Sequence, residues 1–208
     1  MIEVIQKGGP LMWLILLAST VALAVFLERL LHFHRASINV GDLLRGLTNL
    51  IRRGDLTEAL HECGTTPGPV ARVAHAVILR NELPRAELRD VAQEAGQLEI
   101  PKLERNLGLL AAIAYVTPLI GLLGTLIGLL ETFQMIDARN AGATAGDVAA
   151  GVYGSLLASA ASLAVAIPAF LALSFLSARV NGFLRDMERA GIELLAVFDD
   201  ARRVPRKK

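Results

Sequence analysis

Three long runs without an acidic or basic side chain dominate the hydrophobic pattern of this chain. They extend from Gly8 to Leu27, from Asn106 to Leu130 and from Val148 to Ala178. A helix rises about 1.5 Å per residue, so about 20 apolar residues cross the hydrocarbon core of a bilayer. Each run therefore predicts one membrane-spanning helix.

The segment between the first and second runs has a helical pattern. Gly54 is placed to end a first helix, and Asp55 with Glu58 resembles a capping box that opens a second. Pro84 suits the first turn of a longer helix, which we expect to continue into the second run with a bend at Pro101. Apolar positions of period 3.6 support the first of these helices: Val40, Leu43, Leu44, Leu47, Leu50 and Ile51. No strand pattern is convincing, so the sequence predicts an all-α membrane protein with long helical extensions.

Composition and charge fix the expected topology. Apolar residues make up 53% of the chain, which is high for a soluble domain. Of the 21 Lys and Arg residues, all but Lys7 and Arg139 lie between the first two runs or after the third. The positive-inside rule then places residues 28–105 and 179–208 in the cytoplasm, with the N-terminus and residues 131–147 outside. The first run is about 20 residues long, longer than the apolar region of a signal peptide, which favours a retained anchor over a cleaved signal peptide.

These patterns divide the chain into six expected segments. Residues 1–34 hold the periplasmic N-terminus and the first spanning helix, and residues 35–105 form a cytoplasmic helical region. Residues 106–131 are the second span, 132–147 a periplasmic loop, and 148–178 the third span. Residues 179–208 form a cytoplasmic helix with a basic tail, which we attribute to orientation and attraction to anionic lipid.

The second and third runs each carry small and hydroxyl side chains along one helix face. On the second run these are Thr117, Gly121, Gly124, Thr125, Gly128 and Thr132. On the third run they are Gly151, Ser155, Ser159, Ser162, Ala166 and Ala169, with Pro168 placed to kink the helix. One interpretation is a polar path for ions. The other is that each hydroxyl bonds to a carbonyl of its own helix while the small residues pack helices together.

Neither the second nor the third run contains an acidic or basic side chain. Ion-moving proteins usually carry an ionisable group at mid-depth, so we expect a second chain to supply it. Tyr153 fits two roles equally, a pore-lining hydrogen bonder or an anchor at a helix interface.

The sequence lacks the residues that several other functions require. Cys63 is the single cysteine, so we expect no disulfide, and we interpret it as a small apolar residue of a helix. The four histidines share no helix face at metal-binding spacing, and no cofactor motif is present, so neither a metal nor a cofactor is expected. No nucleophile–base pair or Walker loop indicates an enzyme. The net charge of +1 gives no indication of nucleic-acid binding.

Four segments carry a resemblance to a known family: Ala22–Arg29, Glu99–Leu107, Thr117–Thr125 and Leu163–Ala169. With the topology, they identify the chain as similar to the MotA/TolQ/ExbB proton channel family, in its ExbB/TolQ-like branch. The resemblance implies a pentamer in the bacterial inner membrane around a central pore. It also implies two copies of a single-span ExbD/TolR-like partner bearing a membrane Asp, and a TonB/TolA-like effector.

The same resemblance assigns roles to particular positions. The hydroxyls of the channel face map onto Thr125 and Ser159. Gly154 stands where ExbB and TolQ have a glutamate, and Ser162 replaces their usual glycine. The implied function is a motor subunit that couples the proton motive force to mechanical work, with a non-conducting membrane scaffold as the alternative.

Charged residues mark the expected cytoplasmic boundary of the membrane: Glu28, Arg29, Glu99, Glu104 and Arg105. They gate ion exit or pair between subunits in one interpretation, and are interfacial anchors with ordinary ion pairs in the other. The sequence favours protons over sodium, because the polar faces offer few ligands for a dehydrated cation. It does not identify the process that the motor drives.

Overall fold

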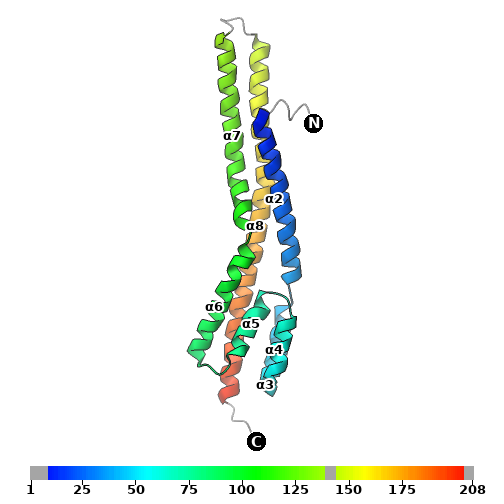
Figure 1. Cartoon of the computed structure of the whole chain (residues 1–208), viewed down its shortest axis with the longest axis vertical. Coiled ribbons are helices and arrows are strands. Elements are labelled where there is room, and N and C mark those ends of the chain that lie inside the picture. The colour runs from blue at the N-terminus through cyan, green and yellow to red at the C-terminus, as the bar shows by residue number, and fades with distance from the viewer. Residues whose placement is uncertain (1–8, 139–143, 204–208) are drawn as a thin grey trace. The chain divides into compact units, whose positions relative to one another are not determined.

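The computed structural model describes residues 9–138 and 144–203, and nearly all of them are helical (Figure 1). Within these ranges there is no strand, so the all-α prediction is confirmed. Lys7, Arg139 and the basic tail from residue 204 onward lie outside the described residues. The helices are α2 (Gly9–Ala36), α3 (Val40–Arg53), α4 (Leu56–Thr65), α5 (Pro69–Leu79), α6 (Arg85–Glu104), α7 (Leu107–Ala138) and α8 (Ala145–Arg203).

The chain forms two compact units. Unit 1 comprises Met1–Glu28 and Asn106–Leu176, and unit 2 comprises Arg29–Arg105 and Ser177–Lys208. The helices α2 and α8 each contribute residues to both units.

Unit 1 has the surface of a membrane protein. Three helical segments are long and apolar enough to cross a bilayer, within Leu11–Arg53, Leu107–Ala138 and Val148–Arg202. Large apolar side chains such as Trp13, Leu119 and Leu171 are exposed along them, whereas the buried positions of α7 include Thr117, Gly121, Gly124 and Thr132. Apolar side chains that point outward from a small-residue interior suit a lipid solvent. The chain is thus a multi-pass membrane protein.

Unit 2 has a compact core of buried apolar side chains. The helices α3, α4 and α5 form an insert after α2 and pack in sequence order, and α6 follows against α5. Leu47, Val77, Ile78 and Leu88 are almost completely buried. The end of α3 is fixed by Gly54, whose φ of 87° is left-handed and whose N–H donates to Ile51 O. The N–H of the next residue donates to Leu50 O, completing a Schellman motif and confirming the helix end expected at Gly54.

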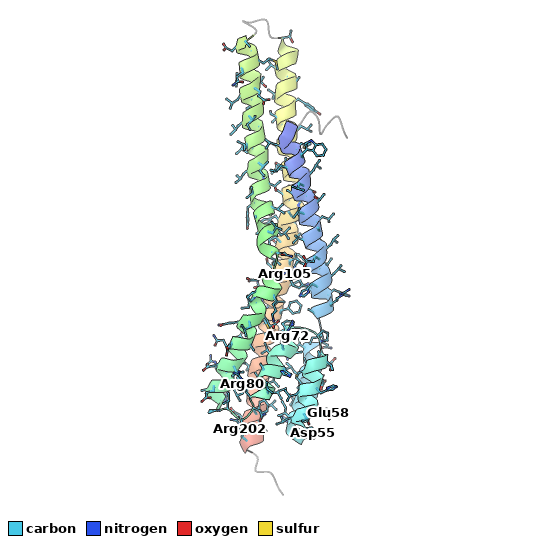
Figure 2. All side chains as sticks on the ribbon, viewed as in Figure 1. Asp55, Glu58, Arg72, Arg80, Arg105 and Arg202 are labelled. Atoms are coloured by element: carbon cyan, nitrogen blue, oxygen red, sulfur yellow. The ribbon has the colours of Figure 1, made fainter. Side chains whose placement is uncertain are left out.

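The expected capping box is wrong in its side chains. Asp55 is the N-cap of α4, but its carboxylate makes no capping hydrogen bond. Its backbone carbonyl accepts from the Ala59 N–H at 3.1 Å instead. Asp55 and Glu58 lie near the junction of α3 and α4 (Figure 2), and both are exposed, so water can satisfy them.

The expected continuous helix through Pro101 is also wrong. Helix α6 runs past Pro101 to Glu104, and α7 begins at Leu107. Asn106 adopts a left-handed φ of 64° between them, a conformation that asparagine tolerates better than most residues. Its side-chain amide donates to Glu28 Oε2 at 2.8 Å, which holds this break against α2.

Candidate functional site

The polar faces of α7 and α8 meet in unit 1. A Cβ added at Gly121 would overlap Ser162 Oγ and lie 2.6 Å from its Cβ, and one at Gly128 would lie 2.6 Å from Ser155 Cβ. A Cβ at Gly151 would overlap Thr132 Oγ1. These glycines therefore permit a close approach of the two backbones that alanine would prevent. We call this contact the α7–α8 seam.

Thr125 and Ser159 form the polar centre of the seam. Their hydroxyls are hydrogen-bonded to each other. Ser159 Oγ also donates to Gly121 O at 2.8 Å, and Thr125 Oγ1 lies 3.2 Å from the same carbonyl and 3.4 Å from Ser155 O. Both residues are only partly buried. The resemblance-based pair is thus in contact, within reach of a molecule outside the chain.

The remaining hydroxyls of the two polar faces bond within their own helices. Thr117 Oγ1 donates to Ile113 O at 2.6 Å and Thr132 Oγ1 to Gly128 O at 2.7 Å. Ser155 Oγ donates to Val152 O and Ser162 Oγ to Ser159 O, each at 2.8 Å. All four residues are at most 5% exposed. Local bonding of this kind satisfies a hydroxyl without leaving it for a ligand.

The other predicted positions of unit 1 have varied surroundings. Gly124 is buried, and a Cβ there would contact Leu11 of α2 and Ala158 of α8. Tyr153 lies on α8 with its side chain 60% exposed. Pro168 lies inside α8, which continues unbroken through it.

The boundary residues differ in burial. Glu28 is exposed and accepts the hydrogen bond from Asn106. Arg29 is only 3% exposed, and its Nη1 donates to Lys102 O at 3.3 Å. Glu104 and Arg105 are exposed at the end of α6, and Figure 2 labels Arg105 there.

Glu99 is the most deeply buried carboxylate in the described part of unit 2, at 4% exposure. Its two oxygens lie 3.0 Å from Arg72 Nε and 2.7 Å from Lys102 Nζ. Arg72 comes from α5 and is labelled in Figure 2, and Glu99 belongs to α6, so the ion pair ties the insert to α6. The sequence predicts Glu99 to be a boundary residue, but the burial of its carboxylate was not predicted. Its helical spacing from the buried Leu88, Val91 and Leu103 is the pattern that could have shown it.

Cys63 is buried in α4, as expected for a small apolar residue. Burial, and secondarily the charge of Glu62, raises the pKa of its thiol to about 11, so the side chain stays a neutral thiol at physiological pH. Among the residues that the structure describes, no three His, Cys, Asp or Glu side chains lie close enough together to hold a metal ion.

Comparison with known proteins gives consistent matches. The sequence model of the MotA/TolQ/ExbB proton channel family matches residues 66–189. An ExbB homologue of Methanothermobacter thermautotrophicus is 26% identical over 90% of this chain and 66% of its own length. The ExbB-like 3 protein of Synechocystis is 30% identical over 91% of this chain and 92% of its own length. The Tol-Pal system protein TolQ of Haemophilus influenzae is 41% identical over 42% of this chain, and the match covers 38% of TolQ.

Proposed function

Because the chain belongs to the MotA/TolQ/ExbB proton channel family, we propose that it is the ring-forming subunit of an ion-driven motor in the bacterial inner membrane. In this proposal, five copies surround two single-span ExbD/TolR-like helices, each bearing one aspartate within the membrane. The ring holds the partner and presents the wall against which that aspartate gains and loses its proton. The relatives named for biopolymer transport support transport as the output of the motor.

The observation that carries the proposal is the hydrogen-bonded pair Thr125–Ser159, whose two residues are only partly buried while the other hydroxyl residues of the seam are buried. A carboxylate in a hydrocarbon-like lumen is costly unless a donor meets it. A hydroxyl is both donor and acceptor. The Thr125 hydroxyl can therefore donate to an ionised aspartate, and it can accept from the same aspartate when that is protonated.

Reorienting the Thr125 hydroxyl toward the partner leaves few hydrogen bonds broken within the seam. Ser159 Oγ keeps its bond to Gly121 O while Thr125 turns its proton from Ser159 toward the partner. Protonation from outside neutralises the aspartate and replaces its charge-assisted bond to Thr125 by a weaker neutral one, so the aspartate can leave; release of the proton to the cytoplasm restores the charge at the next subunit. One proton that crosses 100 mV supplies about 2.3 kcal/mol, enough to bias a step that reorients one ring against the other.

Tyr153, Ser155, Ser162 and Thr117 have supporting roles in this proposal. The last three keep the seam polar and closely packed beside the Thr125–Ser159 pair, since their hydroxyls bond within their own helices. Tyr153, with its exposed phenol, contacts the partner or a neighbouring subunit. At the cytoplasmic end, Glu28, Arg29, Glu104 and Arg105 set the boundary at which the proton leaves.

Proton flux tests the proposal. The complex would be purified through a tag on this chain and reconstituted in vesicles that contain a pH-sensitive dye. Thr125→Val keeps the shape of the side chain but removes the hydroxyl, so we expect assembly to persist and flux to fall to background. Thr20→Val is the matched control, because Thr20 Oγ1 bonds only to the Leu17 carbonyl of its own helix, on an exposed face of α2. Normal flux in Thr125→Val, or no flux in the wild-type complex, would favour the scaffold alternative.

A further inference from the structure

Tyr115 places a phenol deep within the second spanning helix. It follows Asn106, the first residue of the uncharged run, by nine residues and precedes Thr125 by ten. These separations are about 14 Å and about 15 Å along the axis of α7. The side chain of Tyr115 is 60% exposed. Tyrosine in membrane proteins is enriched at the two interfaces, where its hydroxyl meets water, so a phenol at this depth is unusual.

The ring of Tyr115 contacts α8, but its hydroxyl has no bond there. The ring lies edge-on against Phe170, with centroids 5.9 Å apart and an interplanar angle of 75°, a favoured geometry for two aromatic rings. Within residues 9–138 and 144–203, the structure shows no hydrogen bond of the Tyr115 hydroxyl. A hydroxyl without a partner in an apolar environment is costly. We therefore expect water or another chain to supply the partner.

The Tyr115–Phe170 pair lies on the same side of the α7–α8 seam as the Thr125–Ser159 pair. On α8, Ser159 and Phe170 are eleven residues apart, so at 100° per residue they point within about 20° of each other. On α7, Tyr115 points about 80° from Thr125, and Gly124 points about 100° from Thr125 in the opposite sense. A Cβ at Gly124 would contact α2. The two pairs therefore share the side of the seam that is turned away from α2.

We propose that Tyr115 is a positioning residue for proton release: its hydroxyl holds the water through which the proton of the partner's aspartate leaves toward the cytoplasm. Water in an apolar lumen needs polar groups to hold it, because an apolar cavity stays dry. The phenol supplies one donor and one acceptor about halfway between Thr125 and the start of the run at Asn106.

The proton step leaves the phenol unchanged. The aspartate gives its proton to the water held by Tyr115, and that water gives a proton to the next water on the cytoplasmic side. The aspartate becomes charged, the phenol stays neutral, and one proton has moved inward. This inference rests on the proposed function, since it requires the aspartate of the partner.

Tyr115→Phe tests the role of the hydroxyl, because it removes one oxygen atom and keeps the ring against Phe170. We expect native mass spectrometry to show a complex of unchanged composition. In the same vesicle assay, proton flux should be about tenfold lower, which corresponds to a loss of about 1.4 kcal/mol from one hydrogen-bonded step. Thr20→Val is again the control, since it removes a hydroxyl from an exposed face of α2 and should leave the flux unchanged.

The solvent isotope effect separates a slower proton step from a damaged helix pair. If the step at Tyr115 limits the flux of the variant, deuterated water should slow Tyr115→Phe more than it slows the wild-type complex. A distorted seam would lower the number of conducting complexes and leave the isotope effect as in the wild type. Normal flux in Tyr115→Phe, or reduced flux with an unchanged isotope effect, would overturn the role of Tyr115.

Thr125→Val in the same assay distinguishes this inference from the proposed function. If the wild-type complex conducts and Thr125→Val does not, normal flux in Tyr115→Phe overturns only the role of Tyr115 and leaves the motor intact. If the wild-type complex does not conduct, or Thr125→Val conducts normally, the proposed function fails and this inference fails with it.

Discussion

Replacing Gly121 by alanine places a methyl group where α8 leaves no room. The new Cβ would overlap Ser162 Oγ, lie 2.6 Å from Ser162 Cβ and lie 3.2 Å from Ser159 Cα. The hydroxyl can rotate away, but the other two atoms are fixed to the backbone of α8. Because carbon atoms pack at about 3.5–4.0 Å, the helices must separate locally by roughly 1 Å. Overpacking of this kind costs about 1–3 kcal/mol.

Thermal unfolding of the purified protein, followed by circular dichroism, measures this cost. A change of 1 kcal/mol shifts Tm by about 2–4 °C for a chain of this length, so we expect Gly121→Ala to melt roughly 2–12 °C lower. Ser162→Gly removes both clashing side-chain atoms and should recover most of the loss in the double variant. Gly108→Ala in the same helix is the control, since an added Cβ there would meet no described atom within 4 Å apart from its chain neighbours and the nearby backbone of its own helix. An unchanged Tm for Gly121→Ala, or a double variant no more stable than the single one, would refute the close-packed seam.

Three further predictions concern unit 2 and its junction with α7. Glu99→Gln should lower the free energy of unfolding by about 1.5–3 kcal/mol in denaturant titrations, because it removes the ion pairs with Arg72 and Lys102 and makes the hydrogen bond from Lys102 a weaker one. Glu58→Gln at an exposed site should not have this effect. The pKa of the Cys63 thiol is near 11, so the rate of alkylation of the folded protein should still increase above pH 9, and a rate that levels off near pH 9 would contradict this. For the same reason, the contribution of Cys63 to the free energy of unfolding should be constant below pH 9 and fall as the pH rises toward 11. Asn106→Val should lower the free energy of unfolding by about 1–2 kcal/mol, because a β-branched residue resists the positive φ between α6 and α7. Asn106→Gly should lower it less, and equal melting temperatures of the two variants would rule out backbone strain as the cause.

The spanning helices could be predicted from the sequence because their signal is local. A run of twenty or more residues without charge leaves few alternatives to a helix in lipid. The end of α3 was equally accessible, since Gly54 has the backbone freedom that a left-handed cap requires. Both features depend on residues that are adjacent in the chain.

The break between α6 and α7 was not predictable in the same way. Pro101 is the obvious helix breaker, yet α6 continues three residues beyond it, and the chain turns at Asn106. A tertiary contact to Glu28, 78 positions earlier, stabilises that conformation, and no local pattern reports such a partner. The burial of Glu99 was predictable only in part. Its helical register with buried apolar residues was visible in the sequence, but its ion-pair partner Arg72 was not.

The same distinction applies to the polar faces of α7 and α8. Their spacing indicated that hydroxyls share a face, but spacing alone could not separate those that bond within a helix from those that bond across the seam. Thr117, Thr132, Ser155 and Ser162 are saturated by carbonyls of their own helices, so they resist reorientation. Thr125 alone among these threonines bonds across to a second hydroxyl, and the carbonyls of Gly121 and Ser155 also lie within hydrogen-bonding distance of it, so its proton has alternative acceptors. The aspartate of a moving partner helix would then meet a seam in which the Thr125 hydroxyl reorients while the other hydroxyls stay bonded. The free energy of binding the carboxylate would therefore reorient Thr125 and would not deform the helices.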